Sequence, residues 1–222
     1  MKYQLRDYQK KASDAAVMYF KMKSGRNGLL VLPTGAGKSL IIADIAARLE
    51  EPLIVFQPNK EILEQNFAKL QTYGIWDCSI YSASVGRKEI SRITFATIGS
   101  VIRHMKDFQH FKNILIDECH LVKPSDGMYK RFFEQAERRI VGLTATPYRL
   151  YSCMNGSMLK FLTRTRPRVF SQVLYYCQVS ELLAKGFLSR LKYYDVTRID
   201  LTKVRRNSSG ADFDDASLPD EF

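Results

Sequence analysis

A glycine-rich turn between two apolar segments carries the residues whose types and spacing best suit a chemical role. Residues 33–39 read Pro-Thr-Gly-Ala-Gly-Lys-Ser, between the apolar runs 28–32 and 40–47, and this order predicts a strand, a tight loop and a helix. Backbone amides of a first helical turn have no partners within the helix, and the helix dipole is positive there. Gly35 and Gly37 let the backbone fold into a concave nest of amides. The turn therefore predicts a phosphate-binding loop.

Two side chains at the end of this loop complete its expected chemistry. Lys38 would bring a mobile positive charge to the outer phosphates of a nucleotide, and Ser39 would offer its hydroxyl to a magnesium ion. The loop departs from the strict G-x-x-x-x-G-K-S pattern because Leu32 stands in the place of the first glycine. The alternative is a glycine turn beside an ordinary surface lysine, which the flanking strand and helix disfavour. The residues expected to hold the phosphates are Thr34, Gly35, Ala36, Gly37, Lys38 and Ser39.

A pair of acidic residues directly follows another apolar run. Asp117 and Glu118 come after the predicted strand 113–116. Magnesium keeps several waters and takes few carboxylates, so Asp117 alone would suffice to hold it opposite Ser39. Glu118 would then orient or deprotonate the water that attacks the γ-phosphate. The alternative is a pair of surface acids at a strand end, which a phosphate loop upstream makes the weaker interpretation.

A third polar segment ends the predicted strand 139–143. Thr144-Ala145-Thr146 offers small hydroxyls, which suit a hydrogen-bonded relay to His120 better than phosphate binding. The alternative for His120 is a capping or core histidine, which isolated histidines usually are. Residues expected to couple the site to its surroundings are His120, Thr144, Ala145 and Thr146.

Apolar strands alternate with helical segments along the chain, which predicts an α/β fold with a mostly parallel sheet and helices on both faces. In such sheets ligands bind beyond the carboxyl ends of the strands, so the three polar segments should converge on one edge. Expected strands are 28–32, 53–56, 78–81, 93–96, 113–116, 139–143, 169–176 and 191–196. Expected helices are 5–23, 38–49, one from Asn59 as N-cap, 97–101, one around 132–136, and 180–185 with Ser180 as N-cap.

Composition bounds the class of protein. The 222 residues suit one large domain, and 45% hydrophobic with 26% charged residues is typical of globular proteins. No apolar run approaches the ~20 residues of a membrane span, and the N-terminus has no signal-peptide core. We therefore expect a cytoplasmic protein with no membrane contact. None of the four cysteines forms a C-x-x-C pair, which favours free thiols over zinc or disulfides.

Charge points to a polyanionic partner. The net charge of +11 favours nucleic acid, although a basic balance that only serves solubility remains the alternative. Lys160, Arg164, Arg166 and Arg168 lie where periodicity weakens, and predict either a mobile basic loop that contacts nucleic acid or a solvated surface loop. Residues 201–222 lose apolar periodicity and read as a linker, which leaves 1–200 as the folded domain.

These segments together resemble the first motor domain of superfamily two helicases of the DEAD/DEAH-like group. Residues 32–39 are similar to motif I, 117–120 to motif II in its D-E-C-H form, and 144–147 to motif III. Residues 5–9, Leu-Arg-Asp-Tyr-Gln, resemble the adenine-reading Q-motif. The stretches 144–150 and 179–188 look like the bacterial RadD (YejH) branch, with type III restriction-enzyme motor subunits close by. The family's fold is a RecA-like P-loop domain, in agreement with the predicted sheet.

The resemblance implies further roles for residues of this chain. Gln9 would hydrogen-bond the adenine edge, with Arg6 in the same motif. Residues 57–61 resemble motif Ia and 95–100 a later motif that touches the nucleic-acid backbone. The implied cofactors are ATP and Mg²⁺. The implied nucleic-acid contacts are Pro58, Asn59, Thr97 and Ser100.

The family also implies a function and a missing partner. We expect the ATP-binding half of an ATP-dependent DNA helicase or translocase, in DNA repair, with DNA favoured over RNA by the subfamily resemblance alone. Such motors have a second RecA-like domain with an arginine finger, and residues 201–222 would lead toward it, so this chain alone should turn over ATP slowly if at all. The alternatives are an RNA helicase, a nucleic-acid-binding module with a non-hydrolysing site, and a small-molecule kinase, which D-E-C-H and T-A-T-P disfavour.

Overall fold

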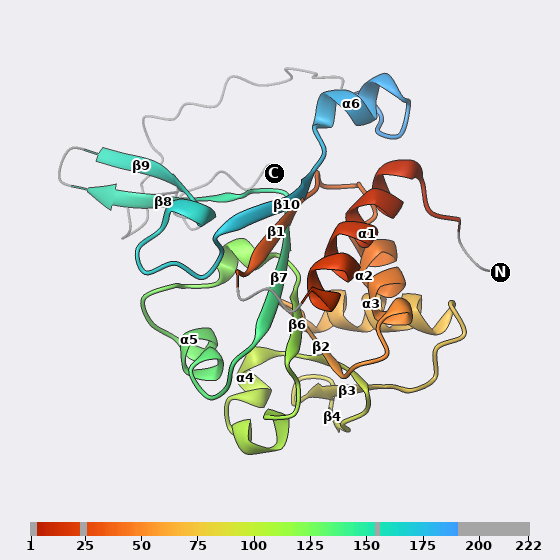
Figure 1. The fold of residues 1–222 in the computed structure, drawn as a ribbon, viewed down its shortest axis with the longest axis vertical. Coiled ribbons are helices and arrows are strands. Elements are labelled where there is room, and N and C mark those ends of the chain that lie inside the picture. The colour runs from red at the N-terminus through yellow and green to blue at the C-terminus, as the bar shows by residue number, and fades with distance from the viewer. Residues whose placement is uncertain (1–3, 23–25, 154–155, 191–222) are drawn as a thin grey trace, which may run out of the picture.

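A central sheet organises the molecule (Figure 1), in a computed structural model that describes residues 4–22, 26–153 and 156–190. The sheet has eight strands in the order β10-β1-β7-β6-β2-β5-β3-β4. All neighbours pair in parallel except β4, which is antiparallel to β3. The strands are β1 (Gly28–Val31), β2 (Leu53–Phe56), β3 (Cys78–Ser82), β4 (Arg87–Lys88), β5 (Ile93–Ala96), β6 (Asn113–Ile116), β7 (Arg139–Thr144) and β10 (Gln172–Tyr176).

Helices cover both faces of this sheet, as the sequence predicts. One face packs against α1 (Asp7–Lys21), α2 (Lys38–Arg48) and α3 (Lys60–Gln71). The other packs against α4 (Ile98–Val101), a 3₁₀ turn at Met105–Phe108 and α5 (Met128–Phe133). The expected doubly covered α/β fold is therefore confirmed.

Side-chain alternation explains why the sheet has two apolar faces. In β2, Leu53 and Val55 join the core under α1–α3, whereas Ile54 and Phe56 join the opposite core. All four side chains are fully buried. A parallel strand covered on both faces must be apolar at every position, and this is why the central strands read as continuous hydrophobic runs.

Most expected elements lie where the sequence places them, and the differences have physical reasons. Asn59 caps α3 as expected, since its Oδ1 accepts a hydrogen bond of 2.9 Å from the amide of Ile62. Ser180 does not cap α6 (Val179–Ala184), because Gln178 holds the N-cap position and the helix begins one residue before Ser180. α5 ends at Phe133 rather than reaching Ala136. The expected strand 191–196 and the linker 201–222 lie outside the described residues.

The sequence prediction is wrong just after the third polar segment, where it expects no regular structure. Residues there form a hairpin of β8 (Tyr148–Cys153) and β9 (Gly156–Phe161), with two 3₁₀ turns elsewhere at Cys119–Leu121 and Leu162–Arg164. The hairpin projects from the sheet, and within the described ranges it pairs with no other strand (Figure 1). Its signal is weak because Tyr148, Leu150, Leu159 and Phe161 face outward and leave no buried face to give a period.

Two expectations from composition can be compared with the described residues. Within them, no helix is long and apolar enough to cross a membrane. Cys78, Cys119 and Cys177 are free thiols, as expected, and the side chain of Cys153 lies outside the description.

Candidate functional site

Three neighbouring strands bring the three polar segments together. β1, β7 and β6 are adjacent and parallel, so residues 33–39, 144–146 and 117–118 leave the same edge of the sheet. The amide of Leu32 donates to the carbonyl of Thr144 at 2.9 Å, which ties the first two segments together. The expected convergence is confirmed.

The loop before α2 has the conformation that its glycines allow. Gly35 and Gly37 have φ of 79° and 77°, in the left-handed region, and Gly37 is the N-cap of α2. A Cβ on Gly37 would lie 2.5 Å from Nε2 of Gln9, so it would displace the end of that side chain, and the positive φ would strain it as well. Leu32, in the place of the first glycine, is fully buried in the core below the loop. Its departure from the strict pattern therefore leaves the nest of amides unobstructed.

Lys38 and Glu118 form an ion pair across the site. Lys38 Nζ lies 2.7 Å from Glu118 Oε1, and both side chains are partly exposed. Glu118 has a left-handed backbone with φ of 46°, which is unusual for a residue with a Cβ. This geometry turns the Glu118 carboxylate toward the phosphate loop.

Asp117 is buried beneath that ion pair and is only 5% exposed. Its Oδ1 accepts from the amide of Glu118 at 3.0 Å, and its Oδ2 accepts from Nδ2 of Asn66 at 3.2 Å. Burial, and next the charge of Glu118, raise the pKa of Asp117 to about 6, against the lowering effect of Lys38. The site thus holds a carboxylate that lacks a close cation.

These donors fit a magnesium ion bound together with phosphates. The Ser39 hydroxyl makes no hydrogen bond to any described residue, and each Asp117 oxygen keeps a free lone pair. No group of three or more acidic, histidine or cysteine side chains in the described ranges could hold a metal by itself. One carboxylate and one hydroxyl is the kind of donor set that Mg²⁺ uses when waters and phosphates complete its shell.

A hydrogen-bonded cluster links the acidic segment to the third polar segment. His120 Nδ1 lies 3.0 Å from Thr144 Oγ1 and 3.3 Å from Glu118 Oε2. Thr144 Oγ1 also accepts from the amide of Thr146 at 3.0 Å. The relay expected between these hydroxyls and His120 is present as contacts, and Ala145 sits within the same turn.

The start of α1 is fastened to the phosphate loop. The Gln9 amide nitrogen and the Tyr8 hydroxyl both donate to the carbonyl of Ala36, each at 2.9 Å. Gln9 Oε1 accepts from the amide of Arg6, also at 2.9 Å. The Arg6 guanidinium lies 4.3 Å over the ring of Phe187, which comes from the segment after α6. Arg6 and Gln9 are therefore brought beside the loop, as the expected nucleotide site requires.

The expected nucleic-acid residues lie at the ends of β2 and β5, on the same edge of the sheet. Pro58 and Thr97 are half-buried, and Asn59 is exposed. Ser100 is 8% exposed, and its hydroxyl accepts from the amide of Ala83 at 2.9 Å and lies 3.0 Å from Thr97 Oγ1. These contacts tie Ser100 to Ala83 and Thr97, and its contact with nucleic acid stays a prediction.

Some residues of the site were not singled out from the sequence. Asn66 lies on the same buried stripe of α3 as Leu63, Phe67 and Leu70, and a polar residue on an apolar stripe is a signal that could have been read. Tyr8 shares one face of the expected helix 5–23 with Ala12, Ala15 and Tyr19, which indicates a helix face but no contact with the phosphate loop. Cys119 packs so closely on β7 that a Cβ at Gly142 would lie 2.5 Å from its sulfur. Burial raises the pKa of the Cys119 thiol well above its usual range, which keeps it a neutral packing group.

Comparison with known proteins supports this assembly of motifs. Residues 2–149 match the family described as type III restriction enzyme, res subunit. A DNA 3'-5' translocase named XPB2 from Sulfurisphaera tokodaii is 30% identical over 151 residues, covering 67% of this chain and 32% of that protein. A DNA 3'-5' helicase named XPB from Mycobacterium tuberculosis is 29% identical over 154 residues, covering 65% of this chain and 27% of that protein. The chain therefore spans about a third or less of the length of these relatives.

A solved structure supports the fold independently. A nuclease-deletion mutant of the Type ISP restriction-modification enzyme LlaGI, in complex with a DNA substrate mimic, superposes with a TM-score of 0.60 at 16% identity. The match covers 83% of this chain and 21% of that one. At this identity the likeness concerns the fold, which is the one predicted from the alternation of strands and helices.

Proposed function

We propose, because the chain belongs to the type III restriction enzyme res-subunit family, that it is the ATP-binding motor half of a DNA helicase or translocase. One observation carries the proposal. Three adjacent strand ends bring a phosphate loop, a buried Asp117 and the Glu118–His120–Thr144 cluster within hydrogen-bonding range of one another. This combination suits the hydrolysis of a nucleoside triphosphate.

The nucleotide would bind along the loop. Amides around Gly35 and Gly37 would cradle the β-phosphate, and Lys38 would leave Glu118 to reach the outer phosphates. Arg6 and Gln9 would meet the base from the start of α1. The remaining phosphate contacts would come from Thr34, Ala36 and Ser39.

Ser39 and Asp117 would hold Mg²⁺, which offsets the charge that develops on the phosphates. Glu118, once released by Lys38, would orient and deprotonate the attacking water. His120 would keep Glu118 and Thr144 in register through its contacts to both. Loss of the γ-phosphate would thereby alter the contacts of residues 144–146.

Nucleic acid would lie beyond the ends of β2 and β5, against Pro58, Asn59 and Thr97. Contacts made there would go to the backbone and would be independent of sequence. DNA is preferred over RNA because the two relatives described above are named as acting on DNA. A second RecA-like domain would supply the arginine finger, so this chain alone should hydrolyse ATP slowly.

The test is a titration of the chain with a fluorescent ATP analogue in the presence of Mg²⁺. Lys38→Ala should abolish binding, whereas Lys60→Ala, which removes an exposed lysine at the start of α3, should leave the affinity unchanged. Equal affinities for wild type and Lys38→Ala would overturn the proposal. ATP turnover measured with single-stranded DNA, duplex DNA and RNA would identify the substrate, and rapid turnover by this chain would contradict the need for a second domain.

A further inference from the structure

Three arginine side chains converge on a hollow that none of the family motifs includes. Arg164, Arg166 and Arg168 line an open hollow of about 460 Å³ together with the hydroxyl residues Thr163 and Ser171. All three arginines are exposed. The hollow lies on the connection between β9 and β10, which crosses the face of the sheet that α5 covers. These three residues are called the arginine patch below.

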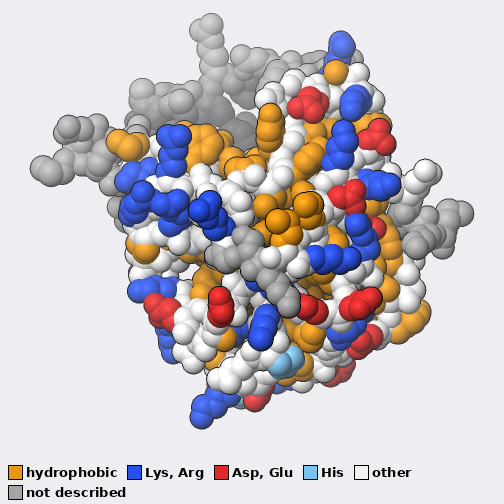
Figure 2. Space-filling view, in the orientation of Figure 1, with side chains coloured by type: hydrophobic (Ala, Val, Ile, Leu, Met, Phe, Trp, Pro, Cys, Tyr) orange, Lys and Arg blue, Asp and Glu red, His pale blue; other side chains and the backbone are white. Residues whose placement is uncertain are grey.

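The arginine patch has no acidic residue to neutralise it. Between positions 138 and 180 the sequence contains no aspartate or glutamate, and its seven basic residues are Arg138, Arg139, Arg149, Lys160, Arg164, Arg166 and Arg168. Among the described residues, no carboxylate lies within ion-pair distance of the patch. Figure 2 shows basic side chains gathered beside the base of the hairpin, with the acidic side chains of this view outside that group.

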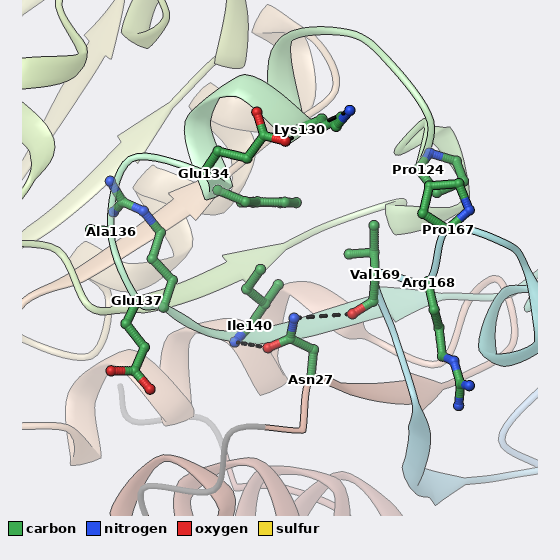
Figure 3. A pocket seen from close by; sticks show the side chains of 12 residues that line it. Asn27, Pro124, Lys130, Glu134, Ala136, Glu137, Ile140, Pro167, Arg168 and Val169 are labelled. Atoms are coloured by element: carbon green, nitrogen blue, oxygen red, sulfur yellow. Dashed lines mark hydrogen bonds and ion pairs between the residues drawn. The ribbon is translucent and has the colours of Figure 1, made fainter.

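The segment that carries the patch is anchored to the folded domain at both of its ends. Leu162 and Phe170 are buried at its two ends. Asn27 accepts from the amide of Ile140 at 3.1 Å and donates to the carbonyl of Val169 at 3.0 Å, which fastens the segment to β7 (Figure 3). Binding to a fixed segment costs little backbone entropy.

The nearest acidic residues of the neighbouring pocket are directed elsewhere. Glu134, at the C-cap of α5, lies 3.7 Å from Lys130. Glu137 lines the same pocket, and Figure 3 shows its carboxylate on the side opposite the guanidinium of Arg168. Figure 3 also shows the side chain of Arg168 extending away from Glu134 and Lys130. The guanidinium of Arg168 is therefore left to the arginine patch.

Guanidinium groups hold phosphates through two parallel N–H···O bonds, and several arginines at one hollow favour a ligand with several phosphates. Phe161, beside the patch, exposes a ring that packs edge-on against Tyr148 at 6.3 Å. Aromatic rings interleaved with basic groups are typical of surfaces that bind nucleic acid. We propose that the arginine patch binds the phosphate backbone of nucleic acid, as a contact separate from residues 58–59 and 97. The inference rests on the proposed function, because it adds a contact to the nucleic acid that the proposed motor would bind.

The test compares two variants that lose the same charge. One is Arg164→Gln/Arg166→Gln/Arg168→Gln, and its control is Lys10→Gln/Lys11→Gln/Lys21→Gln on exposed positions of α1, which covers the opposite face of the sheet. Each is titrated against labelled duplex and single-stranded oligonucleotides over a range of NaCl concentrations. The slope of log K against log salt should fall by about 2 to 3 in the arginine variant, because each lost phosphate contact removes roughly 0.7–0.9. The control should keep a slope close to that of the wild type.

Two outcomes would overturn the inference. An unchanged slope in the arginine variant would mean that the patch does not touch the backbone, and an equal fall in both variants would mean that only net charge matters. A third variant, Arg164→Lys/Arg166→Lys/Arg168→Lys, should keep most of the wild-type salt slope, which separates loss of charge from damage to the fold.

Failure of the inference is distinguishable from failure of the proposed function. The arginine variant should bind the fluorescent ATP analogue like the wild type, because the patch lies away from the phosphate loop. Lys38→Ala should lose the nucleotide and keep its oligonucleotide affinity. A wild-type chain that binds no oligonucleotide would overturn both proposals, whereas an intact salt slope in the arginine variant would overturn this one alone.

Discussion

Lys38 Nζ and Glu118 Oε1 lie 2.7 Å apart, so the lysine expected to bind phosphates is held by the carboxylate expected to activate water. Neither group can perform its expected role while the pair stays closed. A nucleotide that draws Lys38 away would also free Glu118. One ion pair thus links phosphate binding to the availability of the base.

Glu118→Gln should therefore increase the affinity for ATP while it prevents hydrolysis. The amide holds Lys38 more weakly, and an ion pair of this partial exposure contributes about 0.5–1 kcal/mol, which corresponds to about a two- to fivefold tighter Kd. The measurement is a fluorescent-ATP titration. Glu134→Gln, which removes the same charge at the C-cap of α5, serves as the control and should leave the Kd unchanged. Weaker binding by Glu118→Gln would show that the ion pair does not compete with the nucleotide.

Gln9 has two expected roles, because it supports the phosphate loop and would also recognise the base. Comparing Gln9→Ala with Tyr8→Phe separates these two roles. Both substitutions remove a donor to the carbonyl of Ala36, so each should lower the free energy of unfolding by about 1–2 kcal/mol. Only Gln9 also has an amide, and because both of its ends are already bonded, it would meet the adenine edge with its second N–H or the second lone pair of its Oε1. We expect Gln9→Ala to reduce the preference for ATP over GTP and Tyr8→Phe to preserve it, as measured by competition titration. Equal preferences in the two variants would confine Gln9 to a supporting role.

The sheet and its converging motifs could be predicted because each central strand is buried on both faces and each polar segment directly follows one. The β8–β9 hairpin could not, since its apolar residues are exposed and no packing imposes a period on them. Ser180 was a plausible cap by type, but the helix begins at Val179. The ion pair between Lys38 and Glu118 depends on the backbone of Glu118, whose positive φ leaves no mark in the sequence.

Asn66 should position Asp117 for its metal. Its Nδ2 donates to Asp117 Oδ2 at 3.2 Å from a fully buried place on α3. Asn66→Leu keeps a similar volume without the donor, so the Mg²⁺ concentration needed for half-maximal nucleotide binding should rise on the order of tenfold. Gln71→Leu, the same kind of change at the far end of α3, should leave the Mg²⁺ requirement alone. If both variants behave like the wild type, Asn66 only fills the core.

When no metal is bound, Asp117→Asn should make the protein more stable, and this gain in stability should grow as the pH rises. The folded-state pKa of Asp117 is raised to about 6 from an ordinary value of 3.8, mainly by burial and next by the charge of Glu118. The folded state therefore binds more protons than the unfolded state between about pH 4 and pH 6, and its stability falls as pH rises through this window. Well above pH 6 the charged carboxylate costs on the order of 3 kcal/mol. The amide of the variant avoids this cost, and Asn66 can rotate so that its Oδ1, which has no described partner, accepts from it.

The measurement is chemical unfolding in EDTA at a series of pH values. The variant should exceed the wild type in stability at neutral pH, and the difference should shrink as the pH falls and vanish below about pH 3, where Asp117 is protonated in both the folded and the unfolded states. Asp126→Asn, an exposed acid, should change stability by less than about 0.5 kcal/mol at either end of the range. A constant difference across the pH series would mean that the gain comes from packing. A less stable variant at neutral pH would mean that the neighbouring Lys38 already compensates the buried charge.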